Sequence, residues 1–385
     1  MMKIGITCYP TVGGSGVMAT ELGKMLAEEG HEIHFITSGV PFRLDKIDPK
    51  IFYHEVELNH YPVFQYPPYD LALATKMAEV IDQEKLDILH VHYAMPHAVC
   101  AILARDIAKH KVGIVTTLHG TDITVLGIDN TFQKMIKHGI EQSDAVTAVS
   151  KSLVRQTQEM LHVNKEISVI YNFVNEKEYY PKEGASLKKQ YGIASDEKVL
   201  IHISNFRKVK RVQDIVRTFQ KIGQQMKCKL LLVGDGPEYF STVQLVRELE
   251  LENHVLFLGK QNNISDLLSI SDLMLLLSEK ESFGLVLLEA NVCKVPCIAT
   301  NVGGIPEVID HGKTGYLVDL GDIEKASRYA LDLLTNASKL EQFSENAYMY
   351  ARQHFASQKI VKQYLNVYDR ILTTNQLEKG EYDAD

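Results

Sequence analysis

Short apolar runs alternate with longer amphipathic segments along most of the chain. Strands are short and buried, whereas helices repeat their apolar positions at helical spacing, so this alternation predicts strand and helix in turn. The predicted strands, some with the loop that follows, are residues 3–8, 32–37, 87–93, 113–122, 144–150 and 167–172, then 198–205, 229–238, 254–259, 272–278, 295–300 and 315–318. The predicted helices between them include 96–110, 131–142, 212–226, 239–250 and 284–293. This order is typical of an α/β fold with doubly wound parallel sheets.

The first strand is followed by Pro10, a glycine loop T-V-G-G-S-G, and a predicted helix over 17–29 that Gly30 ends. Strand, glycine loop and helix are the opening unit of a doubly wound domain. The loop lacks the G-x-G-x-x-G spacing, and no acidic residue stands at the tip of the second strand. Both absences disfavour a nicotinamide-dependent dehydrogenase.

A chain of 385 residues is too long for one ordinary α/β core. The polar stretch 175–184, which contains Pro181, interrupts the pattern and predicts a linker. We therefore expect two Rossmann-like domains that face each other across a cleft. The predicted parts are an N-terminal domain 1–174, a C-terminal domain 175–355, a helix 356–375 that packs back on the first domain, and a disordered acidic tail 376–385.

Composition narrows the class of protein. The net charge is -8 and no long basic run compensates for it, which excludes a typical nucleic-acid-binding protein and disfavours stable docking on anionic membranes. Five cysteines at irregular spacings predict reduced thiols rather than a disulfide framework. Because neither a signal sequence nor an apolar run of transmembrane length is evident, we expect a cytoplasmic protein.

The stretch E-K-E-S-F-G-L-V-L-L-E, residues 279–289, predicts a strand end, a polar turn and a helix that opens near Gly284. Backbone amides at a helix N-terminus favour an anion, and Glu281 and Glu289 are acceptor-only side chains that suit sugar hydroxyls. Taken alone, two such glutamates are typical of a solvated surface. Together with V-G-G-I-P-E at 302–307, they predict a sugar-phosphate site.

A basic turn, F-R-K-V-K-R at 206–211, follows the first strand of the second half. Its cations would lie at the same sheet edge as the Glu281 turn and neutralise a diphosphate. By itself such a turn is typical of solvated surface.

Four histidines, His90, His92, His97 and His119, suggest a metal site, but their spacing matches no zinc pattern and core or loop positions fit them better. No D-x-D motif lies at a strand end, and no pair of carboxylates stands out as acid and nucleophile. We therefore expect neither a metal cofactor nor a hydrolase.

Taken in order, these motifs resemble the retaining glycosyltransferases of family 4, which have the GT-B fold. The resemblance covers nearly the whole chain: the P-x-x-G-G loop, G-H-E-I-H-F-I-T, L-H-G-T-D, R-x-x-K-R, L-L-L-V-G-D-G-P-E, E-S-F-G-L-V-L-L-E and G-G-I-P-E. Within the family, C-Y-P-T-V-G-G-S-G and H-F-I-T-S-G-V-P-F-R-L are most similar to the members of the bacillithiol pathway that join N-acetylglucosamine to L-malate.

The resemblance implies a UDP-N-acetylglucosamine donor and an L-malate acceptor, retention of configuration, no cofactor, and a homodimer. Glu289 would hold the ribose, Glu281 the donor sugar, and His119 would lie near the sugar 6-hydroxyl. Catalytic cations would be Arg207 and either Lys210 or Arg211; the wider family spaces its arginine and lysine further apart, which leaves the second cation open. The implied donor-binding residues are Gly14, Asn205, Gly234, Ser282, Phe283, Gly284, Leu285 and Glu289.

Malate carries two carboxylates, so an acceptor site for it needs cations or converging N–H groups. Lys151, Arg155 and the amides around Ser15 would bind the carboxylates, and hydroxyls of Tyr93 and Thr117 at strand ends would add contacts. A surface or packing role is the alternative for each of these residues. Asp122 is expected to cap a helix.

Three other functions fit parts of the pattern. The first is a family 4 transferase with a lipid or polysaccharide acceptor, for which the basic helix around Arg105, Lys109 and Lys111 would be the sign. The second is a GT-B UDP-sugar epimerase or phosphorylase, which needs no organic acceptor. The third is a nucleotide-sugar sensor, which the basic turn and both glutamates disfavour.

Overall fold

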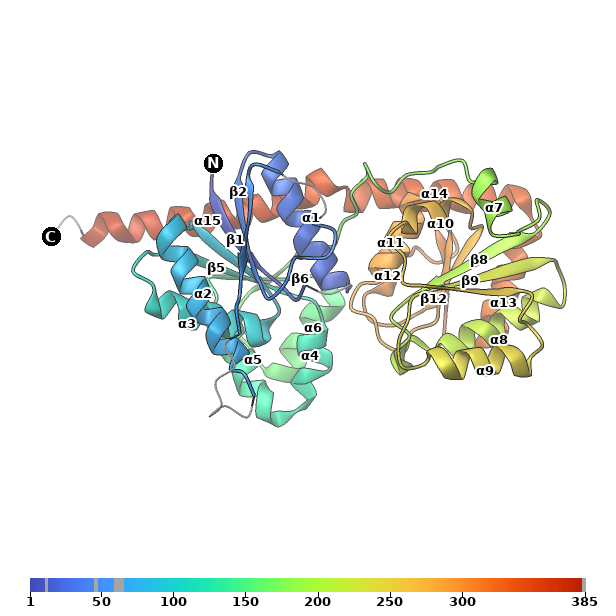
Figure 1. The fold of residues 1–385 in the computed structure, drawn as a ribbon, viewed down its shortest axis with the longest axis horizontal. Coiled ribbons are helices and arrows are strands. Elements are labelled where there is room, and N and C mark those ends of the chain that lie inside the picture. Colours follow the sequence, from blue (N-terminus) through green and yellow to red (C-terminus); the bar gives the residue numbers. More distant parts are fainter. Residues whose placement is uncertain (11–12, 45–47, 59–65, 383–385) are drawn as a thin grey trace. The chain divides into compact units, whose positions relative to one another are not determined.

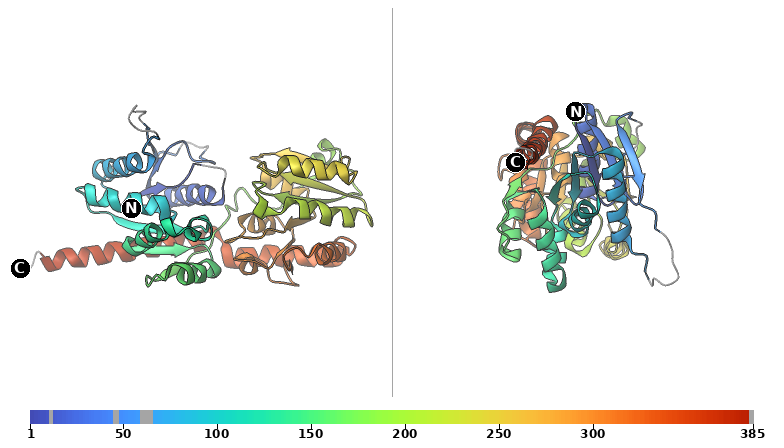
Figure 2. Two further views of the ribbon diagram at one scale, coloured as in Figure 1. Left: turned by 90° about the horizontal axis from the view of Figure 1, so that it is seen from below. Right: turned by 90° about the vertical axis from the view of Figure 1, so that its left-hand side faces the viewer.

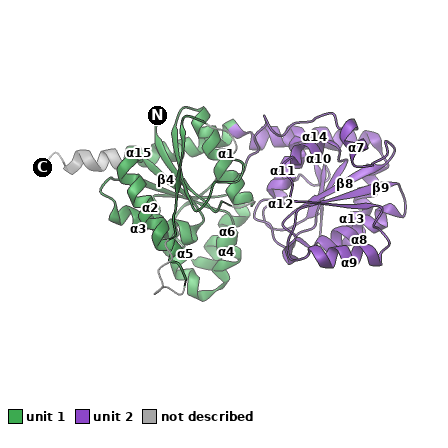
Figure 3. Ribbon diagram, in the orientation of Figure 1, with its two compact units in different colours: residues 1–172, 358–385 green, residues 173–357 purple. Residues whose placement is uncertain are grey.

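The computed structural model describes residues 1–10, 13–44, 48–58 and 66–382. The chain divides into two compact units, which are residues 1–172 with 358–385 (unit 1) and residues 173–357 (unit 2) (Figure 3). The division after residue 172 lies close to the linker that the polar stretch 175–184 predicts. Each unit holds its own parallel sheet between layers of helices (Figure 1).

The described part of unit 1 forms a seven-stranded parallel sheet in the order β3-β2-β1-β4-β5-β6-β7. Its strand order reverses direction beside β1, as in doubly wound folds. The strands are β1 Lys3–Thr7, β2 Glu32–Thr37, β3 Ile51–Glu55, β4 Ile88–His92, β5 Gly113–Leu118, β6 Ala145–Ala148 and β7 Ile167–Val169.

Helices cover both faces of this sheet (Figure 2). On one face α2 and α3 share a core with Ile36, Leu89 and Val91 of the strands. On the other face Gly23 of α1 lies against Phe35. The helices are α1 Gly14–Glu28, α2 Tyr69–Glu84, α3 Val99–Ile107, α4 Thr121–Thr124, α5 Asn130–Gln142 and α6 Lys151–Leu161, with short turns η1 Ala94–Ala98 and η2 Leu126–Ile128.

Three local predictions for unit 1 need correction. Gly14 and Ser15 belong to the first turn of α1 and not to the loop before it. The apolar pattern also did not reveal β3 and α2. β3 is an edge strand that is half exposed, so it lacks the continuous apolar run by which the buried strands are recognised.

Unit 2 contains a six-stranded parallel sheet in the order β10-β9-β8-β11-β12-β13. Helices α8, α9 and α13 supply apolar side chains to one core cluster with β8, β9 and β11. The strands are β8 Lys198–Ile203, β9 Cys228–Val233, β10 Val255–Gly259, β11 Leu273–Leu276, β12 Cys297–Thr300 and β13 Gly315–Val318. The helices are α7 Ala185–Gln190, η3 Lys208–Lys210, α8 Val212–Gly223, α9 Tyr239–Glu248, α10 Ile264–Ser269, α11 Leu285–Val292, α12 Ile305–Val308, α13 Ile323–Leu334 and α14 Ala337–Phe355.

The last helix, α15 Ser357–Tyr382, lies mostly in unit 1. Tyr368 is fully buried there and its hydroxyl bonds to His90 Nδ1 at 2.7 Å. The structure continues α15 through residues 376–382, and the disorder expected for the acidic tail 376–385 stays a prediction. Residues 383–385 lie outside the described residues. Among those described, the helices fall short of the length and apolar content needed to cross a membrane.

Candidate active site

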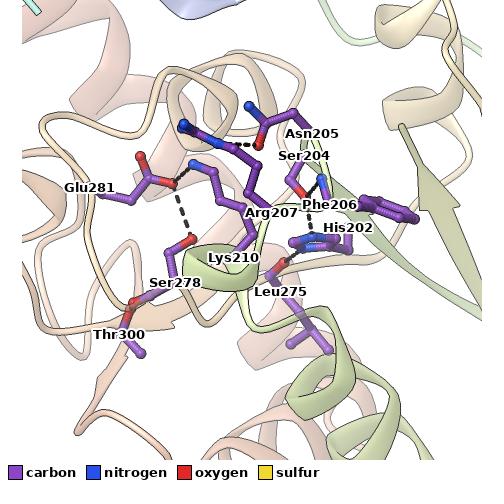
Figure 4. A network of polar contacts seen from close by, with 10 residues as sticks. All are labelled: His202, Ser204, Asn205, Phe206, Arg207, Lys210, Leu275, Ser278, Glu281 and Thr300. Carbon is purple, nitrogen blue, oxygen red and sulfur yellow. Dashed lines mark hydrogen bonds and ion pairs between the residues drawn. The ribbon is translucent and has the colours of Figure 1, made fainter. Parts of the chain in front are cut away.

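The carboxyl ends of β8 and β11 bring two charged side chains of unit 2 together. Lys210, at the end of η3, places its Nζ 2.5 Å from Glu281 Oε1 (Figure 4). Both side chains are largely buried, with exposed fractions of 16% and 13%. The pair therefore lies at the edge of a parallel sheet where ligands of doubly wound folds bind.

Two hydroxyl side chains at neighbouring strand ends hold Glu281 in place through a chain of hydrogen bonds. Ser278 Oγ donates a hydrogen bond to Glu281 Oε1 at 3.1 Å, and Thr300 Oγ1 donates to the Ser278 carbonyl at 2.5 Å. Ser278 and Thr300 are fully buried. The sequence analysis missed both, although each is the polar residue that ends an apolar run, and that position is the signal by which they can be found.

The turn that carries Glu281 rests directly on the loop after β12. A Cβ on Gly303 would lie 1.8 Å from the Glu281 carbonyl oxygen, and one on Gly304 would lie 2.1 Å from the Ser282 carbonyl oxygen. Gly304 N–H donates to the Glu281 carbonyl at 3.0 Å. The two glycines of V-G-G-I-P-E therefore permit a backbone contact that fixes the Glu281 turn.

Helix α11 begins directly after this turn. Gly284 precedes it with a φ of 87°, in the left-handed region that favours glycine. The amides of the first turn, from Leu285 onward, have no acceptor within the helix and so favour an anion. Phe283 is buried and packs edge-on against Phe355, and Glu289 is 4% exposed. The structure thus places residues 281–285 at the start of α11 and Glu289 one turn further along the helix.

The loop after β8 contains Asn205 and Arg207, whose side chains are exposed. Arg207 Nε donates to Asn205 Oδ1 at 3.4 Å (Figure 4). Gly234, at the end of β9, has a φ of 125°, and a Cβ there would lie 1.8 Å from the Ser204 carbonyl oxygen. Gly234 therefore permits close packing of two loops, and Asn205 and Arg207 extend from one of them.

Arg211 is not part of this cluster. It has a φ of 49° directly before α8, and its Nε donates to Asp214 Oδ2 at 2.6 Å. Lys210, one residue earlier, contacts Glu281 instead. The two cations therefore have different partners, and which of them contacts the diphosphate stays a prediction.

A second polar cluster lies at the carboxyl ends of β1, β4 and β5 in unit 1. Ser15 Oγ and Tyr93 OH are 2.6 Å apart, and His92 Nδ1 and His119 Nε2 are 2.7 Å apart. Tyr93 and His119 have ring centroids 5.6 Å apart. The structure thus brings together three of the predicted residues, Ser15, Tyr93 and His119.

Asp122 is fully buried at this end of the sheet. Its carboxylate accepts the N–H groups of Gly120 and Ala94 at 3.0 Å each. Burial nevertheless raises its pKa to about 6. Asp122 therefore ties two loops together. It is not the helix cap expected from the sequence, because Gly120 is the N-cap of α4 and the helix has no side-chain cap hydrogen bond.

Thr117 does not join this cluster. Its hydroxyl is fully buried and lies 2.7 Å from both His90 Nε2 and Thr147 Oγ1. Because this hydroxyl faces the layer that Tyr368 of α15 covers, it is not available to an acceptor. We therefore withdraw Thr117 from the predicted acceptor residues.

The remaining two predicted acceptor residues are cations on α6. Lys151 is the first residue of the helix, Arg155 lies one turn on, and both are exposed. Ser150 caps the helix by accepting the Leu153 N–H at 3.0 Å. Because α6 follows β6, its first turn lies at the carboxyl edge of the sheet in unit 1, as expected.

Burial of imidazoles makes the stability of unit 1 sensitive to acid. Burial lowers the pKa of His90 and His119 to about 3 and that of His97 to about 4. A histidine of the unfolded chain binds a proton near pH 6.5, whereas these buried imidazoles stay neutral in the folded protein. Their contribution to stability is therefore fully present above about pH 6.5, and it is lost as the pH falls toward about 4. We expect each histidine to lower the free energy of unfolding by about 1.4 kcal/mol per pH unit in that window.

Urea unfolding at several pH values between about 7 and 5 measures this slope. His97→Gln should flatten it, because one buried imidazole is removed. His138→Gln changes an exposed histidine of α5 and is the matched control. Equal slopes for the parent protein and His97→Gln would contradict the prediction.

Comparisons with known proteins show the family to which the chain belongs. The family model "Glycosyltransferase Family 4" matches residues 12–178, and "Glycosyl transferases group 1" matches residues 185–350. The chain is 61% identical over 371 residues to N-acetyl-alpha-D-glucosaminyl L-malate synthase of Bacillus anthracis, which covers 96% of this chain and 97% of that protein. It is 26% identical to the uncharacterized glycosyltransferase MJ1607 of Methanocaldococcus jannaschii, over 95% of this chain and 98% of that protein.

Solved structures share the fold. A glycosyltransferase from Rickettsia africae aligns with a TM-score of 0.80 at 24% identity, covering 96% of this chain and 98% of that one. The Anabaena protein HepE in complex with UDP-glucose aligns with a TM-score of 0.79 at 22% identity, covering 96% of this chain and all of the other. The chain therefore belongs to the family 4 and group 1 glycosyltransferases, and it has their GT-B fold.

Proposed function

We propose that this glycosyltransferase moves N-acetylglucosamine from UDP-N-acetylglucosamine to the hydroxyl of L-malate. The observation that carries the proposal is the 61% identity, over 96% of the chain, to a Bacillus anthracis protein named as the synthase of that product. The polar clusters of the two units supply the chemical groups that a sugar nucleotide and a dicarboxylate need.

The donor is proposed to bind at the start of α11. The amides of Phe283, Gly284 and Leu285 would bind the diphosphate, with Ser282 beside them. Glu289 would accept hydrogen bonds from the ribose hydroxyls, and carboxylate acceptors suit this role because they pair with two hydroxyls at once. Asn205 and Gly234, in the loops after β8 and β9, would line the approach of the same ligand.

Catalysis is proposed to rest on Lys210, Arg207 and Glu281. UDP gains negative charge as the glycosidic bond breaks, so a fixed cation beside the diphosphate stabilises the transition state more than the ground state. Lys210, which pairs with Glu281 at 2.5 Å, and Arg207, in the loop after β8, would be the cations beside the diphosphate. Glu281 would then hold hydroxyls of the donor sugar.

His119 is proposed to contact the sugar near its 6-hydroxyl. Burial lowers its pKa to about 3, so the imidazole is neutral near pH 7. A neutral imidazole offers one donor and one acceptor nitrogen, and His119 Nε2 already pairs with His92. The other nitrogen, Nδ1, is therefore the one proposed to meet the sugar.

The acceptor is proposed to bind in unit 1. Ser15 lies in the first turn of α1, a helix N-terminus that favours a carboxylate, and its hydroxyl is held by Tyr93. Arg155 and Lys151 at the start of α6 would bind the carboxylates, for which arginine offers a bidentate fork.

The reaction is proposed to proceed on one face of the sugar with retention of configuration. The malate oxygen would form the new bond to the anomeric carbon as the bond to UDP breaks, and a phosphate oxygen would take the malate proton. This route needs no second carboxylate as nucleophile.

Purified protein incubated with UDP-N-acetylglucosamine, with and without L-malate, tests the proposal. UDP release that depends on malate, together with a product whose mass is that of the sugar joined to malate, is the expected result. Release without malate would indicate hydrolysis or epimerisation instead. Light scattering would test whether the protein is a homodimer. Cell fractionation would test whether it is cytoplasmic. Both remain predictions.

Replacing Arg155 with alanine should raise the KM for L-malate by about tenfold, which corresponds to about 1.4 kcal/mol of binding free energy. The affinity for UDP should stay nearly unchanged. The reason is that Arg155 lies on α6 of unit 1, whereas the α11 turn proposed to bind UDP belongs to unit 2. Lys111→Ala, an exposed cation before β5 at the opposite edge of that sheet, is the control. Equal losses in malate use and UDP binding would refute an acceptor role.

A lipid acceptor is the second candidate, favoured by one observation. α2 and α3 pack together in one core and leave Leu71, Leu103 and Ile107 exposed at 59%, 39% and 57%. Apolar side chains next to Arg105 suit a lipid surface. Co-sedimentation with anionic liposomes, together with UDP release in the presence of lipid and absence of malate, would favour this function over the first.

A further inference from the structure

A group of metal-ligand side chains lies in unit 1 at the β3 edge of the sheet. His34 of β2, His54 of β3 and Glu84, the last residue of α2, each place one ligand atom within 4.8 Å of the other two. Within the described part of the chain, this is the one group of histidine, cysteine and acidic side chains with such spacing. None of the three residues belongs to the proposed donor or acceptor site.

The strand register explains why the imidazoles meet. β2 and β3 are parallel, and His34 pairs with Phe52 while Ile36 pairs with His54. Residues two apart on a strand share a face, so both imidazoles project from the same face of the sheet. α2 packs on this face, since its side chains share a core with Ile36, and its C-terminal end presents Glu84.

A second carboxylate orients the buried imidazole. Glu32 Oε1 lies 3.0 Å from His34 Nε2, and His34 Nδ1 lies 2.9 Å from His54 Nε2. A carboxylate that pairs with Lys3 at 2.8 Å is an acceptor, so His34 Nε2 carries the hydrogen and Nδ1 presents its lone pair toward His54. This carboxylate–histidine pairing is the arrangement that supports metal-binding histidines in many proteins.

We propose that His34, His54 and Glu84 bind a divalent first-row transition ion, with Zn²⁺ as its representative. Two imidazoles and one carboxylate are ligands that Zn²⁺ accepts, and a tetrahedral site with bonds of about 2.0–2.1 Å separates its ligand atoms by roughly 3.4 Å. The imidazole nitrogens are already 2.9 Å apart. Glu84 is partly exposed at a helix end, so its carboxylate can rotate toward them.

The ion would act on structure rather than on sugar transfer. β3 is an edge strand and has hydrogen bonds to β2 alone among the described strands. An ion held by β2, β3 and α2 joins that edge strand to the helix that follows it in the chain. Because an ion that binds only the folded state stabilises it, Zn²⁺ should raise the unfolding temperature of the protein.

The full-length protein, stripped of metal with a chelator and desalted, is titrated with Zn²⁺ against a chromophoric chelator. We expect one equivalent to bind. Glu32→Gln should weaken binding by about 10–100-fold, and His54→Ala and Glu84→Gln should weaken it further. Glu84→Gln keeps the side-chain volume, and thermal unfolding without Zn²⁺ checks that each variant folds. His138→Ala, an exposed histidine of α5, is the matched control.

A rise in unfolding temperature with Zn²⁺ that His54→Ala abolishes and His138→Ala retains would support the site. The proposal is overturned if the stripped protein binds no Zn²⁺. It is also overturned if folded Glu84→Gln and His54→Ala bind Zn²⁺ as tightly as the parent protein, or if His138→Ala weakens binding as much as they do.

Discussion

Replacing Glu281 with glutamine is expected to lower kcat/KM for UDP release by about 100-fold, with the fold retained. Hydrogen bonds to charged groups contribute about 1.5–3 kcal/mol, and each tenfold in rate corresponds to about 1.4 kcal/mol. Lys210→Met should lower it by about 10²–10³-fold, because a cation aimed at developing charge acts mainly in the transition state. Steady-state UDP release measures both effects.

The pairing of these two side chains gives the experiment a second readout. Lys210 and Glu281 are largely buried and 2.5 Å apart, so each single variant leaves a charge without its partner. The double variant removes both charges. Its free energy of unfolding should exceed that of the less stable single variant, while its activity stays near that of the less active one.

Arg211→Met is the matched control, because Arg211 adjoins Lys210 in sequence but pairs with Asp214 at 2.6 Å. Its turnover should stay within a few-fold of the parent value. If Arg211→Met lost as much activity as Lys210→Met, the assignment of the phosphate-binding cation to Lys210 would be wrong.

Replacing Gly303 with alanine is expected to lower the free energy of unfolding of unit 2 by about 3–5 kcal/mol and to remove turnover. The added Cβ would lie 1.8 Å from the Glu281 carbonyl oxygen, so the two loops must separate. That movement breaks the hydrogen bond from Gly304 N–H to the same carbonyl and releases the Glu281 turn. Urea unfolding and UDP release report the two effects.

Gly312→Ala is the control that separates the effect of the close contact at Gly303 from the effect of its left-handed backbone. Gly312 has a φ of 80° and Gly303 a φ of 54°, but nothing lies within 4 Å of a Cβ added at Gly312. Its substitution should cost only the left-handed backbone penalty of about 1–2 kcal/mol and leave UDP release unchanged. Similar destabilisation by the two substitutions would show that the close contact with the Glu281 turn is unimportant.

The order of the buried strands along the chain, and with it the fold class, could be predicted because both depend on local sequence patterns. An apolar run such as Leu273–Leu276 is buried on both faces of a parallel sheet, so its sequence alone identifies it. β3 could not be found in this way, because Ile51–Glu55 is a half-exposed edge strand. The helix α2 after it was likewise missed.

The sequence by itself determined which residues stand at the carboxyl ends of the strands, since those positions follow from the alternation of strand and helix. It therefore predicted the turn at Glu281, the basic turn after β8, and the polar residues Ser15 and Tyr93. Membership of the glycosyltransferase family followed from the order of these motifs. All of these depend on residues close together in the chain.

Only the tertiary structure decided which side chains meet. The left-handed backbone of Arg211 turns it to Asp214 and leaves Lys210 to Glu281, and α15 covers the layer that Thr117 faces. Glu84 reaches the histidines of β2 and β3 only because α2 packs across that face. Such contacts join residues far apart in the chain, so packing rather than local periodicity selects them.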